Sequence, residues 1–255
     1  LFRSRMLLDW PSLKENFSEW NNGHEDAPFG FILSMEGADP IVSPDHAIEW
    51  YQAGLRVVGL AHNSPSAYAH GTRCQGGLTA QGRELLRVME ETGLILDLTH
   101  LADESFWEAT KLFHGPVLAS HNDCRAITPG DRQYDDDQIR LIIERDGIIG
   151  APFDAWMMVP GWSLDRAKSP RVTLEAAVRH IDHICQLAGN TRHVAIGSDL
   201  DGGFGTEQCQ EDLNTIADLQ KLGPLLHQHG YTEADVNGIF HGNWLRFFER
   251  AWKTA

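Results

Sequence analysis

Basic residues are scarce in this chain of 255 residues, because only 21 lysines and arginines stand against 36 aspartates and glutamates. A formal charge of −15 without any basic cluster argues against nucleic acid or an anionic membrane surface as a partner. Cysteine is also scarce, and the four cysteines are scattered without a Cys-x-x-Cys pair. That usage is typical of free thiols in a reducing compartment and not of a disulfide or zinc-finger framework, so a cytoplasmic location is expected.

Long hydrophobic runs are missing as well. No stretch of 18 apolar residues occurs, so the sequence predicts no membrane-spanning helix. Neither an internal repeat nor a linker divides the chain, and 42% hydrophobic residues can form a full core. We therefore expect residues 1–255 to form one domain. The chain opens on Leu1 instead of methionine and has no signal peptide, so a preceding segment is expected.

Short apolar runs alternate with helical patterns along the chain. The predicted strands are residues 29–35, 55–61, 94–99, 116–120, 147–153 and 193–198. The predicted helices are residues 44–53, 79–91, 103–113, 135–146, 173–187, 211–228 and 232–250. Each strand is a near-continuous apolar run, which is typical of a parallel sheet with both faces covered. The pattern predicts an α/β fold.

Polar side chains with metal-binding chemistry follow several of these strands. His100 and His121 end two consecutive strands, and Glu36, His62 and Asp199 end three others. Carboxyl ends of parallel strands lie at one edge of the sheet, where α/β folds place their chemistry. Imidazoles and carboxylates suit a divalent ion such as zinc, and a carboxylate can bridge two ions that together activate one hydroxide. The sequence therefore predicts a metal site.

The motifs around these residues resemble those of the renal (membrane) dipeptidase family of zinc peptidases, which are amidohydrolase-like barrels. The resembling segments are Ser-Met-Glu-Gly at 34–37, residues 54–62, Asp-Leu-Thr-His at 97–100, Ala-Ser-His at 119–121, Ile-Gly-Ser-Asp-Leu-Asp-Gly at 196–202 and Asn243. Their order and spacing agree with the family from about residue 29 to residue 250. The resemblance implies a metal-dependent dipeptidase with a small dipeptide as substrate.

The resemblance also implies a role for each residue. Glu36 would bridge two Zn²⁺ ions, and His100 with His121 would complete the site of one of them. Asp199 would act as general base and then general acid. His62 would steady the oxyanion of the tetrahedral intermediate. Arg132, eleven residues after His121, would bind the terminal carboxylate of the substrate.

A TIM-type (β/α)₈ metal-dependent hydrolase barrel is implied too, with a first strand that carries a His-x-Asp pair of zinc ligands. The chain shows six strands instead of eight, and no such pair precedes Glu36 at the family's spacing. The first one or two strands are therefore expected to be missing, and the second ion is doubtful. The His-Glu-Asp of residues 24–26 imitates the pair but follows no apolar run, so we interpret it as a loop.

Each residue also has a plainer interpretation. Glu36 could cap a turn, and His62 and Arg132 could make loop hydrogen bonds or a surface salt bridge. Asp201 competes with Asp199 as the catalytic acid, but Asp199 directly follows the strand. His180 and His183, three residues apart on one helix, are interpreted as part of its surface; this pair lacks the glutamate of a zinc-binding helix.

Two other functions stay open at this point. The same barrel and metals could hydrolyse another small amide, such as an N-acyl amino acid. A catalytically inactive barrel could instead serve binding or assembly. The sequence leaves the oligomeric state open, with a homodimer as one option.

Overall fold

The computed structural model describes residues 3–24, 26–165 and 167–253, so Glu25 of the His-Glu-Asp motif lies outside the described residues. The chain divides into two units. The first takes in Leu1–Val117 and Phe248–Ala255, and the second is Leu118–Phe247. The expectation of one domain over the whole chain stays a prediction.

Three parallel strands organise the first unit. They are β3 (Leu33–Glu36), β4 (Leu55–Gly59) and β5 (Ile95–Asp97), hydrogen-bonded in that order. Glu36 pairs with Gly59, and Gly59 pairs with Asp97, so the last residues of the three strands form one row. The loops after the three strands therefore emerge at the same edge of the sheet.

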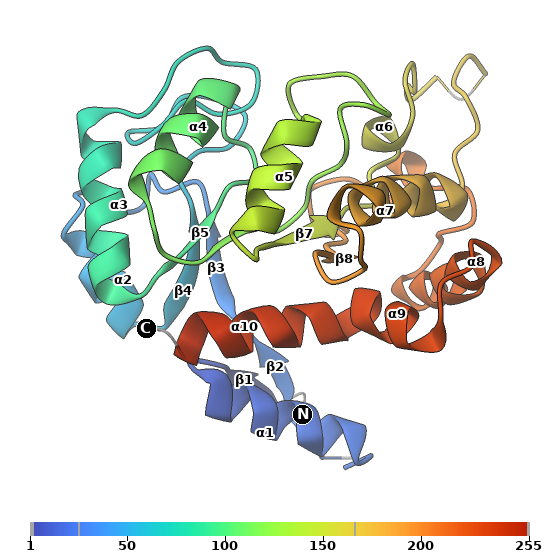
Figure 1. Ribbon diagram of the computed structural model, residues 1–255, viewed down its shortest axis with the longest axis horizontal. Coiled ribbons are helices and arrows are strands. Elements are labelled where there is room, and N and C mark those ends of the chain that lie inside the picture. The colour runs from blue at the N-terminus through green and yellow to red at the C-terminus, as the bar shows by residue number, and fades with distance from the viewer. Residues whose placement is uncertain (1–2, 25, 166, 254–255) are drawn as a thin grey trace. The chain divides into compact units, whose positions relative to one another are not determined.

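Helices α2 (His46–Gln52) and α3 (Ala80–Thr92) connect these strands, and α4 (Asp103–Leu112) follows β5; α2 packs beside α3, and α3 beside α4 (Figure 1). Helix α3 begins at Thr79, whose hydroxyl accepts a hydrogen bond from the Gly82 amide, and ends at Gly93 in the left-handed conformation. Its apolar face buries Leu85, Leu86, Val88 and Met89. The helices therefore form as the sequence predicts, with ends shifted by a few residues.

The predicted strand over residues 29–35 is wrong in its extent. It breaks into β2 (Phe29–Phe31) and β3, because β2 pairs with β1 (Ser4–Met6) in a separate parallel two-stranded sheet. Helix α1 (Trp10–Asn21) joins β1 to β2 and is capped by the Asp9 carboxylate. Strand β1 was not predicted, since a run of three residues carries no readable periodicity.

Strands β6 (Val117–Ala119), β7 (Ile148–Ala151) and β8 (Val194–Ile196) are parallel and hydrogen-bonded in that order in the second unit. The boundary between the two units falls within β6, after Val117. Leu118 pairs with Ile148, and Ala151 pairs with Ile196. The helical segments are α5 (Asp136–Glu144), α6 (Ala155–Met158), α7 (Leu174–Ala188), the 3₁₀ helices η1 (Thr206–Gln208) and η2 (Ile216–Lys221), α8 (Leu222–Gln228), α9 (Glu233–Asn237), the π-helix η3 (Gly238–Gly242) and α10 (Asn243–Lys253), whose residues from Phe248 on belong to the first unit.

The single helix predicted for residues 211–228 is wrong. Residues 211–215 are not helical, because tertiary hydrogen bonds replace the helical ones. The Glu211 amide donates to the Val172 carbonyl, and the Asp212 carboxylate accepts from the Leu174 amide. The predicted α/β class with a parallel sheet is confirmed. No helix in the described part of the chain has the length and apolar character needed to span a bilayer.

Candidate active site

Three of the predicted site residues meet at the carboxyl edge of the first unit's sheet. Glu36 is the last residue of β3, His62 follows β4 by three residues, and His100 follows β5 by three. The Glu36 Oε1 atom lies 3.2 Å from His100 Nε2 and 3.8 Å from His62 Nε2. The two imidazole rings are 4.2 Å apart between centroids. The strand register therefore brings together a carboxylate and two imidazoles, as the sequence predicts.

His100 is held in an unusual backbone conformation. Its φ is +68°, in the left-handed region that side chains with a Cβ seldom adopt. A turn sets it up, because the Asp97 carboxylate accepts from the Thr99 amide. The Thr72 hydroxyl then contacts His100 Nδ1 at 3.2 Å and donates to the His100 carbonyl. With Nδ1 occupied in this way, the Nε2 atom of a buried ring is directed at Glu36.

The loop that carries Thr72 also holds His62. The Thr72 amide donates to the His62 carbonyl at 2.9 Å. A Cβ on Gly71 would lie 1.8 Å from that same carbonyl oxygen, so only glycine fits. The side chain of His62 stays 49% exposed. An imidazole anchored at its backbone and open to solvent can reach a bound substrate.

His121 and Asp199 face each other in the second unit. His121 follows β6, and the Ser120 hydroxyl lies 2.9 Å from its Nδ1 atom. Its Nε2 atom lies 3.9 Å from Asp199 Oδ2, which is too long for a hydrogen bond. Asp199 follows β8 with φ of +54°, and a Cβ on Gly202 would lie 2.5 Å from its carboxylate. Gly202 thus leaves the space that the Asp199 side chain occupies.

Two glycines let neighbouring segments approach the end of β6. A Cβ on Gly150, in β7, or on Gly197, just after β8, would lie 2.0 Å from the Ser120 carbonyl oxygen. Larger residues would displace Ser120 and with it His121. The glycine in the Gly-Ser-Asp segment therefore has a packing role two residues before Asp199.

Arg132 is 5% exposed, which the surface alternative did not anticipate. Its Nη2 donates to the His121 carbonyl at 2.9 Å, and its Nη1 donates to the Asn122 side chain. Arg132 thus braces the loop after β6. Its predicted contact with a substrate carboxylate stays a prediction.

The interpretation of His180 as helix surface is wrong. Its ring is fully buried; Nδ1 accepts from the Cys124 amide and Nε2 donates to the Met158 carbonyl. Asp123 lies 3.5 Å from Nδ1 and is itself buried without a hydrogen bond to either oxygen. Burial lowers the pKa of His180 to about 4 and raises that of Asp123 well above its usual value. His183 is partly exposed and pairs with Asp136.

We expect His180 to make stability depend on pH. Unfolded His180 takes up a proton as the pH falls through 6.5, whereas the folded ring stays neutral down to about pH 4. Its contribution is therefore full above pH 6.5 and is lost toward pH 4, by about 3 kcal/mol. Urea unfolding from pH 4.5 to 7 should show the advantage of wild type over His180→Gln growing with pH. A pH-independent difference between wild type and His180→Gln would contradict this.

Asp154, three residues after the end of β7, caps α6 and is buried. Its carboxylate accepts from the Trp156 amide and from Gln208 Nε2 at 2.7 Å. The pKa of Asp154 is raised, chiefly by burial and to a smaller extent by the negative charge of Asp199, although the hydrogen bonds lower it. Asp154 therefore links α6 to η1 close to Asp199.

The donor atoms suit a metal ion. Two ligands bound tetrahedrally at about 2.1 Å from zinc are about 3.4 Å apart, close to the 3.2 Å between Glu36 and His100. Glu36, His100 and His121 each offer one ligand atom, a carboxylate oxygen or a ring nitrogen. Both histidines have Nδ1 beside a hydroxyl, the arrangement that orients Nε2 of a ligating imidazole.

Comparison with known proteins identifies the family. The family model of the membrane dipeptidases, peptidase family M19, matches residues 5–255. The chain belongs to the membrane dipeptidase family. This confirms the resemblance drawn from the strand-end motifs, and it supports the predicted metal-dependent dipeptidase function.

Individual members of this family and fold are similar along most of the chain. A metallopeptidase from Rhodobacter sphaeroides, solved with a phosphinate mimic of the dipeptide L-Ala-D-Ala, is 28% identical; the match covers 98% of this chain and 70% of that one, with a TM-score of 0.81. The probable dipeptidase PvdM from Pseudomonas aeruginosa, 19% identical with a TM-score of 0.87 over 100% and 75% of the two chains, shares the fold.

An uncharacterized dipeptidase of Schizosaccharomyces pombe is 28% identical over 229 residues, which are 88% of this chain and 53% of that protein. The chain thus spans about half the length of this curated relative.

Sequence reasoning missed the residues that orient the site. Thr72 lies 28 residues before His100, in a loop with no periodic pattern, and only the tertiary fold brings the two together. Ser120 adjoins His121, but a serine at a strand end carries no specific signal. Among non-glycine residues that the structure describes, positive φ occurs at Arg73, His100, Asp146 and Asp199. Two of these four are candidate site residues, which agrees with the concentration of backbone strain at functional sites.

Proposed function

We propose that this chain carries the active site of a metal-dependent dipeptidase. The observation that carries the proposal is the approach of the Glu36 carboxylate to His100 Nε2. The Thr72 hydroxyl contacts Nδ1 on the other side of the same ring. A buried imidazole presented to a half-exposed carboxylate at ligand separation is an arrangement that a divalent ion stabilises. Membership of the membrane dipeptidase family supports the same chemistry.

Glu36 and His100, which lie together in the first unit, are proposed as metal ligands, and the resemblance to the family implies His121 as another. Imidazole and carboxylate donors suit zinc, which is the metal we propose. Glu36 carries a second carboxylate oxygen, so it can bridge to another ion. The family's own dipeptidases support the choice of a dipeptide as substrate.

The bound metal would supply Lewis acidity and lower the pKa of a water molecule. Asp199 would accept the proton of the attacking water at a carboxylate oxygen and return it to the leaving amine. His62, with its ring open to solvent, would donate a hydrogen bond to the oxyanion. Arg132 would hold the terminal carboxylate of the dipeptide from beside His121. These roles are the ones that the resemblance to the membrane dipeptidase family implies.

Zinc-loaded protein is expected to hydrolyse unblocked dipeptides, and activity should fall to background after dialysis against a chelator and return when zinc is added. Amine release from Ala-Ala, Leu-Ala and Ala-Leu measures this directly. A dipeptide with an amidated carboxyl terminus should be a poor substrate, because Arg132 loses its charged partner.

The two alternative functions predict different results in that experiment. Preference for N-acyl amino acids over free dipeptides would favour the amidohydrolase acting on another small amide. A well-folded sample that binds no zinc and releases no amine would favour the catalytically inactive barrel and overturn the proposal.

A further inference from the structure

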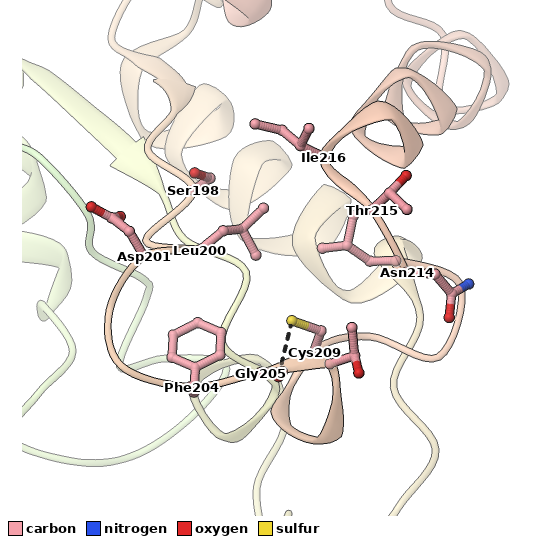
Figure 2. A pocket seen from close by; sticks show the side chains of 11 residues that line it. Ser198, Leu200, Asp201, Phe204, Gly205, Cys209, Asn214, Thr215 and Ile216 are labelled. Atoms are coloured by element: carbon pink, nitrogen blue, oxygen red, sulfur yellow. Dashed lines mark hydrogen bonds between the residues drawn. The ribbon is translucent and has the colours of Figure 1, made fainter.

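We propose that a cavity beside Asp199 holds the apolar side chain of the amino-terminal residue of a dipeptide. The inference rests on the proposed function and goes further by assigning a substrate class. The cavity of about 510 Å³ lies within the second unit, in the segment that follows β8 (Figure 2). Its lining includes Ser198 and Leu200, the two residues that flank Asp199 in the chain. A group bound here therefore lies beside the chain segment that carries the proposed proton carrier.

The cavity surface is mainly apolar. Figure 2 shows the Leu200 side chain, the Phe204 ring and the Cys209 sulfur bordering one space, with Ile216 across from them. Cys209 and Leu213 are buried at its base. Ile216 is 74% exposed, so its side chain is open to a molecule that enters the cavity. The volume falls in the range of about 300–1,000 Å³ that is typical of small-molecule sites.

Two tertiary hydrogen bonds and one local helix cap hold the cavity wall in place. Gln208 Nε2 in η1 donates to Asp154, and the Glu211 amide donates to the Val172 carbonyl. The Asp218 carboxylate accepts from the Asn214 and Thr215 amides and so orders the turn before Ile216. A wall fixed at three points is preformed, so a side chain that enters need not order it.

The charge around the cavity indicates which of the two residues of the dipeptide binds there. Asp201 lies in the lining, and of the described residues that form it none is lysine, arginine or histidine. The Asp201 carboxylate attracts an α-ammonium group and repels a carboxylate. The proposed carboxylate partner, Arg132, lies instead beside His121. The side chain that enters is therefore that of the residue with the free amine.

The test compares kcat/KM for Leu-Ala, Ala-Leu and Ala-Ala on zinc-loaded protein, with either enantiomer of the second residue. We expect kcat/KM for Leu-Ala to exceed that for Ala-Ala by about tenfold or more, since each added methylene in an apolar site contributes binding free energy. Phe204→Ala should reduce this ratio about tenfold, and Ile216→Ala about threefold. The control Leu112→Ala removes an exposed leucine of α4, in the first unit, and should leave the ratio unchanged.

Calorimetric binding of the same dipeptides separates failure of the cavity from failure of catalysis. Tighter binding of Leu-Ala than of Ala-Ala, lost in Phe204→Ala, supports the cavity even if no amine is released, and the proposed function alone then fails. Equal turnover and equal binding of the two dipeptides would overturn the cavity assignment, and so would a preference determined by the second residue. Either result leaves the proposed dipeptidase function unaffected.

Discussion

Glu36→Gln is expected to abolish dipeptide hydrolysis while leaving the fold intact. Glutamine has the shape of glutamate but not its charge, so it is a much weaker ligand for a hard divalent ion. The Glu36 side chain is 48% exposed, and glutamine there keeps an amide oxygen that can face His100 Nε2. The expected loss in kcat/KM is about a thousandfold or more, which corresponds to about 4 kcal/mol of transition-state stabilisation.

The measurement is kcat/KM for Ala-Ala together with bound zinc per chain and the thermal midpoint. Glu49→Gln is the matched control, because Glu49 is also an exposed glutamate near a histidine, on α2. It should keep full activity. Unchanged turnover in Glu36→Gln, with zinc bound as in wild type, would remove Glu36 from the site.

Asp199→Asn is expected to lower kcat by about 10² to 10⁴ with a smaller effect on KM, because the amide cannot carry the proton. Asparagine tolerates positive φ nearly as well as aspartate, so the backbone at φ of +54° is retained. The pH profile is the diagnostic readout: the limb due to ionisation of Asp199 should disappear from the variant. A structural role alone would lower activity at every pH alike.

Asp146→Asn provides the matched control for Asp199. Asp146 also has positive φ, at +51°, but its carboxylate pairs with Arg246 at 2.8 Å. The control should lose some stability and retain kcat. A larger loss of kcat in Asp201→Asn than in Asp199→Asn would contradict the assignment and favour Asp201 as the proton carrier.

The residues at the strand ends were predictable because their signals are local. A buried parallel strand is a short apolar run, and its end is marked by the first polar residues, such as Glu36 or His121. Parallel register then places equivalent ends in one row, as the pairs Glu36–Gly59 and Gly59–Asp97 show. The family membership that these motifs predict is confirmed, and the roles of individual residues stay predictions.

The sequence by itself determined the α/β class, the six strands and the types of side chain that follow them, since burial and chain direction are encoded by neighbouring residues. Only the tertiary structure decided that Thr72 orients His100, that His180 is buried beside Asp123, and that residues 211–215 are not helical, with residues 213–215 lining a cavity. The reason is physical: these features depend on hydrogen bonds between residues far apart in the chain, and such contacts leave no periodic trace in either partner.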